Sequence, residues 1–146
     1  MQVQSDIQGI TESVLVMREG SVCYGVHTVR VRQILSEISV TSMPMQLSCV
    51  CGIANFKGRI IPILSLGKIC GEEAEERTCV IFEEKEQLYG LMVSNVERIV
   101  DGGQMEEGTQ QEMKTGVVRF RKVIQAEEPV FILDMEKIMN GIMEGA

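Results

Sequence analysis

The residues that could carry redox or metal chemistry are five cysteines, at Cys23, Cys49, Cys51, Cys70 and Cys79. Their number is odd and their spacing is irregular, and Cys49-Val50-Cys51 would place two thiols on one face of a strand. A structural zinc site needs about four ligands, commonly as two similarly spaced pairs. The chain has one histidine, His27, and no second cysteine pair. We therefore expect buried free thiols, which behave as small apolar side chains, and neither a metal nor a cofactor.

Residues for hydrolytic or group-transfer chemistry are scarce. His27 has no serine or cysteine in a recognisable nucleophile motif around it. No glycine-rich segment ends in the Lys-Ser/Thr of a phosphate-binding loop. The aspartates fall near the N-terminus, in a turn and at a helix start, so they offer no pair for acid–base catalysis: Asp6, Asp101 and Asp134. The sequence favours a binding protein over an enzyme.

Charge and hydropathy argue against two further classes. The net charge is −7, and nucleic-acid binding needs a basic footprint that the one local cluster, Arg119, Arg121 and Lys122, does not supply. No apolar run approaches the roughly 20 residues that cross a bilayer. Residues 1–6 lack the basic-then-apolar pattern of a signal peptide. We expect no nucleic-acid partner, no membrane insertion and a cytoplasmic location.

The stretch from Gly52 to Leu66 is the most informative part of the chain. It predicts a hairpin with limbs at 51–56 and 59–64 and a turn at 55–58, where Gly58 can adopt a positive φ. Pro62 lies inside the second limb and has no N–H, so this limb should be an edge strand or should break there. An incompletely paired apolar strand beside a polar turn indicates a contact surface.

The remaining chain predicts short strands joined by turns. We expect strands near residues 14–17, 22–26, 38–43, 78–83, 88–93, 96–100, 117–120 and 129–133. Residues 28–35 fit a helical turn or an alternating strand. The acidic run 72–77 predicts a solvated loop, in which nothing would desolvate a carboxyl and shift its pKa. Asp134 should cap a final helix whose apolar face is Met135, Ile138, Met139 and Ile142.

About nine or ten strands at regular spacing predict a mainly β fold. We divide the single domain, 1–146, at the acidic loop into two small barrels that share a core. Subdomain 1 covers about 14–70, subdomain 2 covers about 78–133, and the helix 134–143 packs back on them. Tyr24-Gly25 and Tyr89-Gly90 each follow a hairpin turn and hint at two related units. The groove between the barrels would be a natural binding site.

Four segments resemble the CheW family, the coupling proteins of bacterial chemotaxis. Gly-Ile-Ala-Asn-Phe-Lys-Gly-Arg-Ile-Ile-Pro-Ile-Leu-Ser-Leu, at 52–66, is similar to the family pattern Gly-Val-Ile-Asn-Leu-Arg-Gly-x-Val-Ile-Pro-Val-Val-Asp-Leu. Three further segments match in the same order: 24–34, 89–96 and 130–138. The resemblance covers most of the chain, from about Val14 to Met139.

The resemblance implies two five-stranded SH3-like barrels and an adaptor without catalytic activity. Such an adaptor bridges the cytoplasmic tips of chemoreceptors to the regulatory domain of the histidine kinase CheA. That domain has a similar double barrel and docks pseudo-symmetrically, with the receptor tip in the groove between barrels. Carried over by position, the contact residues are Val31, Gln33, Ile34, Gly52, Asn55, Lys57, Gly58 and Ile60. For Gly52 and Gly58, a role in the geometry of the turn and the core explains the glycine as well as direct contact with a partner does.

The chain departs from the family pattern at several positions. Gln33 and Lys57 stand where the family commonly has a glutamate and an arginine joined in a salt bridge, and Ser65 and Ser94 replace aspartates. These changes leave the partner open, so a divergent CheW-like module of another sensory kinase pathway is the alternative function. A thiol redox or metal protein that uses Cys49 and Cys51 is a third hypothesis.

Overall fold

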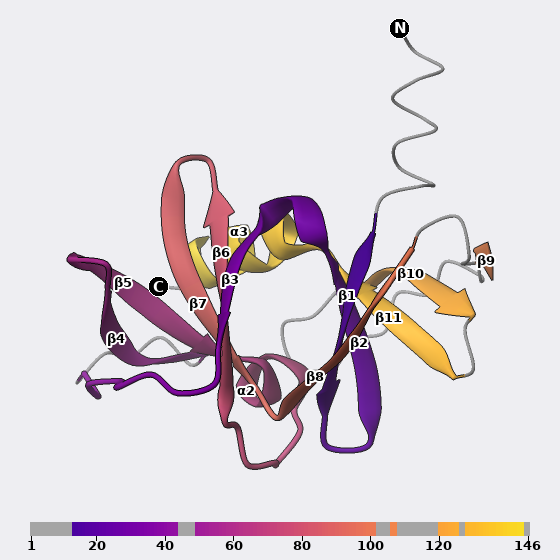
Figure 1. Cartoon of the computed structure of the whole chain (residues 1–146), viewed down its shortest axis with the longest axis horizontal. Helices are drawn as coiled ribbons and strands as arrows, with labels where there is room; N and C mark the ends of the chain where they lie inside the picture. Colours follow the sequence, from indigo (N-terminus) through magenta and orange to yellow (C-terminus); the bar gives the residue numbers. More distant parts are fainter. Residues whose placement is uncertain (1–12, 44–48, 102–105, 108–119, 126–127, 145–146) are drawn as a thin grey trace, which may run out of the picture.

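The computed structural model describes residues 13–43, 49–101, 106–107, 120–125 and 128–144. These residues form two sheets that lie side by side (Figure 1). The six-stranded sheet has the order β8 (Asn95–Val100), β1 (Val14–Glu19), β2 (Val22–His27), β11 (Pro129–Leu133), β10 (Phe120–Gln125) and β9 (Glu106–Glu107). The five-stranded sheet has the order β3 (Val31–Leu35), β6 (Thr78–Glu84), β7 (Gln87–Val93), β5 (Arg59–Ser65) and β4 (Val50–Phe56). A 3-10 turn η1 (Thr28–Arg30) and the helices α2 (Leu66–Cys70) and α3 (Met135–Glu144) complete the fold.

The two sheets repeat one arrangement. In each, the second strand of one hairpin pairs in parallel with the second strand of another: β2 with β11, and β7 with β5. Gly25 opposes Ile132 in the first parallel pair, and Gly90 opposes Ile63 in the second. The outer strands β8 and β3 each pair antiparallel with the first strand of a hairpin, β1 and β6, and each pairing contains one register shift.

The repeated Tyr-Gly dipeptide follows from this packing. A Cβ on Gly25 would lie 2.6 Å from Val14 and 2.8 Å from Ile132, and one on Gly90 would lie 2.6 Å from Ile63. Only glycine lets the hairpin lie this close to the apolar side chains beside it. The hint of two related units in the sequence is therefore confirmed by the register of the strands.

The predicted boundary between the subdomains is wrong. Each sheet takes strands from both sides of the acidic loop, because β3 follows the β1–β2 hairpin but pairs with β6. In the same way, β8 follows the β6–β7 hairpin but pairs with β1. Two similar halves have thus exchanged strands, which a linear division at residues 72–77 cannot describe.

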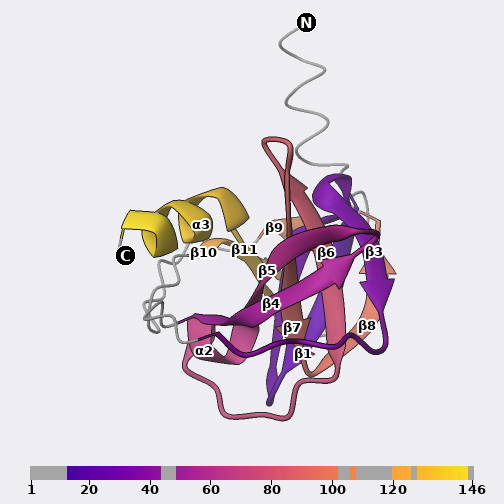
Figure 2. The same ribbon diagram turned by 90° about the vertical axis from the view of Figure 1, so that its left-hand side faces the viewer.

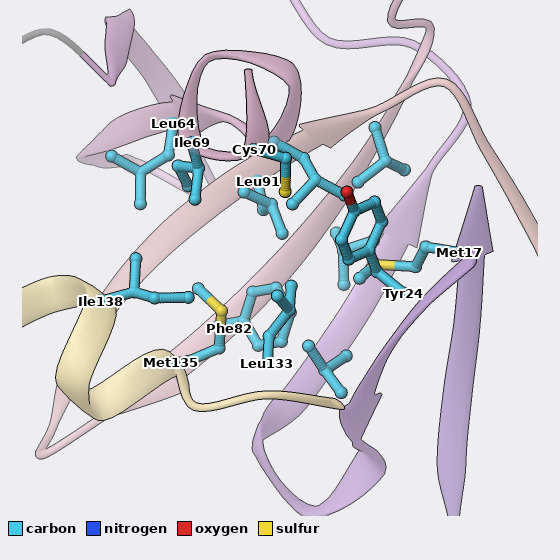
Figure 3. Close-up of a cluster of buried hydrophobic side chains, with 14 of the residues drawn as sticks. Met17, Tyr24, Leu64, Ile69, Cys70, Phe82, Leu91, Leu133, Met135 and Ile138 are labelled. Atoms are coloured by element: carbon cyan, nitrogen blue, oxygen red, sulfur yellow. The ribbon is translucent and has the colours of Figure 1, made fainter. Parts of the chain in front are cut away.

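The apolar core has one shared part and two smaller parts. The shared cluster lies between the sheets and receives side chains from both helices, including Ile69, Met135 and Ile138 (Figure 3). A second cluster lies within the six-stranded sheet and a third lies within the five-stranded sheet. Asp134 directly precedes helix α3 and caps it, since its Oδ1 accepts the Lys137 N–H at 3.1 Å. The mainly β fold with SH3-like subdomains, a common core and a C-terminal helix is confirmed.

Several local predictions change in detail. Residues 28–35 are both a 3-10 turn and a strand, and residues 38–43 contribute one isolated bridge, Thr41 to Ile53, instead of a full strand. Strand β5 neither breaks at Pro62 nor lies at an edge, since it pairs with β4 along its length. Its pairing with β7 begins only at Ile63, directly after the proline that cannot donate. Residues 104–105 and 108–114 of the predicted loop and 117–119 of a predicted strand lie outside the described residues.

Candidate functional site

The β4–β5 hairpin projects at one side of the molecule, at the left of Figure 1. Asn55 Oδ1 accepts the Gly58 N–H at 3.0 Å and closes the turn. Lys57 and Gly58 have φ values of 52° and 83°. A Cβ on Gly58 would meet nothing within 4 Å, so this glycine serves the backbone conformation of the turn.

Ile60 is the exposed apolar residue of this hairpin. Its side chain is 63% exposed, whereas the adjacent Ile61 is 2% exposed, as alternation along a strand requires. Lys57 Nζ lies 5.3 Å from the centroid of the Phe56 ring, on the same turn. We call Asn55, Lys57, Gly58 and Ile60 the hairpin surface. It combines a rigid turn, a cation and an apolar side chain, which suits contact with another protein.

Gly52 has a structural role. It is buried, and a Cβ at this position would lie 2.1 Å from the Thr41 carbonyl oxygen. The backbones of Thr41 and Ile53 exchange two hydrogen bonds here, at 2.8 and 2.9 Å. Gly52 therefore lets the segment after β3 cross close to β4, and it presents no side chain to a partner.

The other predicted contact residues lie on β3. Ile34 is 42% exposed, while Val31 and Gln33 are half-buried. Arg32 Nε contacts Glu83 Oε1 at 2.8 Å and holds the strand to β6. Strands β3 and β4 stand at opposite ends of their sheet, and Figure 1 shows β3 well away from the hairpin tip. The predicted residues thus form two separate surfaces, and Gln33 and Lys57 lie on different ones.

Sequence reasoning missed three exposed apolar side chains, one of which is Met43, 40% exposed on the segment after β3. Val29 in η1 is 61% exposed and lies directly before β3. We call Val29, Val31, Gln33 and Ile34 together the β3 surface. Ile99 on β8 is 62% exposed. Its position in the six-stranded sheet is equivalent to that of Ile34 in the five-stranded sheet. Ile99 opposes Leu15 of β1, and Ile34 opposes Val80, the equivalent residue of β6. The shared Tyr-Gly dipeptide was the signal that would have aligned these two halves.

The described residues form a hollow that takes in the end of the acidic loop. That hollow, of about 640 Å³, borders the five-stranded sheet and is lined by Ser36, Glu37, Ile38, Ser39, Glu76, Arg77 and Met92. Its walls are the segment after β3, the end of the acidic loop and one side of β7.

The acidic loop is less solvated than its sequence indicates (Figure 2 shows it at the lower edge). Glu76 accepts hydrogen bonds from the Ser65 hydroxyl and the Gly67 N–H, at 2.6 and 2.9 Å. Burial, together with the charge of Glu76, raises the pKa of Glu19 to about 8. The carboxyl whose pKa is raised by burial is that of Glu19, which β1 brings to the loop from another part of the chain.

The cysteines do not support redox chemistry. None of the five forms a disulfide, and burial raises the pKa of Cys51, of Cys79 to about 11 and of Cys70 to about 12. Such thiols stay protonated at neutral pH and are poor nucleophiles. Cys49 belongs to the shared cluster while Cys51 packs against the cluster of the five-stranded sheet, with a register shift between Val50 and Gly52. The predicted single face for the two thiols is therefore wrong.

One group in the described part of the chain has metal-ligand geometry. Ligand atoms of Cys23, Glu97 and Glu128 lie within 4.8 Å of one another. Arg18 donates to both carboxylates, at 2.7 Å to Glu97 and 2.5 Å to Glu128. Burial raises the pKa of the Cys23 thiol to about 11. Arg18 already pairs with both carboxylates, so this group acts as an ion-pair network on the six-stranded sheet.

Comparisons with known proteins place the fold. None of the helices in the described part of the chain has the length and apolar character that a membrane crossing requires. No curated protein sequence matches the chain. The crystal structure of the scaffolding protein TtCheW from Thermoanaerobacter tengcongensis superposes with a TM-score of 0.73 at 21% sequence identity, covering 85% of this chain and 89% of that one. The CheW-like domain family matches residues 13–143, and the chain therefore belongs to the CheW-like domain family.

Proposed function

We propose that this protein is a non-catalytic adaptor of a chemotaxis signalling array. It binds the regulatory domain of a CheA-type histidine kinase and the cytoplasmic tip of chemoreceptors. Membership of the CheW-like domain family supports the class, and the structural neighbour TtCheW is itself described as a scaffolding protein. The observation that carries the proposal is Ile60, which stands 63% exposed on an ordered hairpin.

The hairpin surface has the physical features of a binding hot spot. Moving a large aliphatic side chain from water into a partner contributes about 1.5–3 kcal/mol. The turn is already ordered by the Asn55–Gly58 hydrogen bond, so little conformational entropy is lost on binding. Lys57 adds a positive charge beside Ile60 in a chain of net charge −7, and it selects for a partner with an acidic rim.

A pair of equally exposed isoleucines allows a matched test. Ile60→Asp should weaken binding to the kinase regulatory domain or to a receptor-tip fragment at least tenfold, with an unchanged circular dichroism spectrum. Ile99→Asp changes a residue of the same type and exposure on β8 and should leave that affinity within twofold. Isothermal titration calorimetry measures both. Equal effects of the two variants, or unfolding of Ile60→Asp alone, would contradict the hairpin assignment.

The alternative is a divergent CheW-like module that serves another sensory kinase. Gln33 and Lys57 favour it, because glutamine removes a charge and lysine removes the two-pronged donor of arginine. The two hypotheses differ in the kinase that binds. Titration against each kinase regulatory domain of the same cell assigns the partner, and binding only to a kinase that has no chemoreceptor input would favour the alternative.

A further inference from the structure

Glu19 is a buried carboxyl at the end of β1. Its side chain is 0% exposed. Its Oε1 accepts the N–H of Ser94, the residue between β7 and β8, at 2.9 Å. Its Oε2 is buried and, among the described residues, has no hydrogen-bond partner. A carboxylate in this position would leave an uncompensated charge away from water, which is strongly unfavourable.

Glu76 approaches from the acidic loop and is fixed to the first turn of α2. Its Oε1 accepts the Ser65 hydroxyl at 2.6 Å, and its Oε2 accepts the Gly67 N–H at 2.9 Å. Ser65 is also the N-cap of α2, since its Oγ accepts the Lys68 N–H at 3.2 Å. The carboxyl group of Glu76 therefore belongs to the helix cap and is held in place.

The two carboxyl groups converge over Gly67. A Cβ on Gly67 would lie 2.9 Å from Glu19 Oε2 and 3.4 Å from Glu76 Oε2. The acids Glu72 of the loop, Tyr24 of β2 and Cys70 of α2 lie around Glu19. Two cations belong to the same elements, but Arg77 pairs with Glu75 and the charge of Lys68 acts on Cys51. Since neither cation forms an ion pair with Glu19 or Glu76 among the described residues, a proton is the simplest species that can neutralise the pair.

The equivalent position of the other half uses a cation instead. Glu84 ends β6 as Glu19 ends β1, and it is the other buried glutamate of the described residues. Its Oε2 pairs with the guanidinium of Arg30. One half of the fold thus neutralises this glutamate with an arginine, while the other half brings a second carboxyl to it.

We propose that Glu19 and Glu76 share one proton, with Glu19 Oε2–H donating to Glu76, and that this bond is a clasp that fastens the acidic loop to the six-stranded sheet. Deprotonation transfers that proton to water and leaves two carboxylates facing each other. The repulsion between them favours release of residues 72–77. Because Glu76 and Arg77 line the hollow beside β7, release would also open one of its walls.

The pH range follows from linkage. Burial first, then the nearby charge of Glu76, raises the pKa of Glu19 from 4.5 to about 8 in the folded protein. Between these values the folded state holds one more proton than the unfolded state, so stability falls as pH rises. The unfolding equilibrium constant should rise by up to about tenfold per pH unit from this pair, and the effect should level off above pH 8.

The test is a carboxyl titration of the full-length protein. With ¹³C-labelled glutamate, NMR from pH 3 to pH 10 should show one side-chain carboxyl with a midpoint near 8, absent from Glu19→Gln. Glu76→Gln should move this midpoint down by at least one pH unit, because the neighbouring charge is gone. Glu84→Gln, the matched control, should leave it in place. The wild-type and Glu76→Gln titrations suffice if Glu19→Gln does not fold.

Hydrogen exchange supplies the second measurement. Amides of residues 72–77, corrected for intrinsic exchange, should lose protection above pH 8 in the wild type and keep it in Glu19→Gln, whose amide is neutral at every pH. Three results would overturn the proposal: every glutamate titrating below pH 6, a Glu19 midpoint unchanged in Glu76→Gln, or loop protection that does not depend on pH.

Discussion

Gly52→Ala is the substitution that separates structural glycines from contact glycines in this chain. Gly52 is buried on β4, beneath the segment that crosses from β3. The new methyl group would lie 2.1 Å from the Thr41 carbonyl oxygen and 2.8 Å from its carbon. Both atoms belong to the backbone and cannot rotate away. The crossing segment must therefore retreat until the contact reaches an ordinary distance of 3.4 Å or more.

The cost can be estimated from what the retreat disrupts. The two hydrogen bonds between Thr41 and Ile53, at 2.8 and 2.9 Å, contribute about 1 kcal/mol each. Ile38 and Val40 on the same segment pack against the core of the five-stranded sheet and would lose part of that contact. Together with the strain of overpacking, we expect a loss of about 2–4 kcal/mol in the free energy of unfolding.

Gly58→Ala is the matched control on the same hairpin. Its methyl group meets nothing within 4 Å, but its φ of 83° disfavours a side chain, so we expect a loss of about 1 kcal/mol. Because the chain has no tryptophan, urea unfolding should be followed by far-UV circular dichroism. Equal stabilities of the two variants would refute the reasoning. So would a Gly52→Ala protein that is stable but has lost partner binding, which would make Gly52 a contact residue.

Two further substitutions test the hairpins. The two-residue turn between β6 and β7 has positive φ at both central residues, 50° at Lys85 and 66° at Glu86, although neither is glycine. Glu86→Gly should relieve this backbone strain and raise the free energy of unfolding by about 0.5–1 kcal/mol. A lower urea midpoint in Glu86→Gly would contradict the presence of strain. Gly90→Ala would place a methyl group 2.6 Å from Ile63 and 2.8 Å from Cys79 Sγ, and it should lower the free energy of unfolding by about 1–3 kcal/mol. An unchanged midpoint for Gly90→Ala would show that the parallel β5–β7 pair is not close-packed at this point.

Local patterns were sufficient to predict the hairpins and the helix. The turn at Asn55–Gly58, the limbs around it and the cap at Asp134 depend on residues close in sequence. The exchange of β3 and β8 between the two halves depends on pairings that no local pattern contains. For this reason the sequence led to a boundary between subdomains at the acidic loop, which the strand pairing does not follow. Aligning the halves on Tyr24-Gly25 and Tyr89-Gly90 would have corrected it, since Ile34 and Ile99 then coincide.

The site was predicted in part for the same reason. Ile60 follows a turn on a strand whose next residue is buried, so its exposure follows from strand periodicity. Gly52 could not be assigned, because its neighbour Thr41 is brought there by a crossing segment. Glu19 precedes a glycine and resembles a solvated turn residue in sequence. Only the approach of Ser94 and Glu76 from distant parts of the chain makes it a buried carboxyl.

The measurement that tests the adaptor function most directly is a calorimetric titration of this protein with the regulatory domain of the chemotaxis kinase from the same cell, with and without a receptor-tip fragment. We predict saturable binding of the kinase domain with a dissociation constant in the micromolar range or below, and at least a tenfold loss in Ile60→Asp. We also predict that the receptor fragment binds without displacing the kinase domain. Absence of binding to every kinase regulatory domain of that cell would contradict the account.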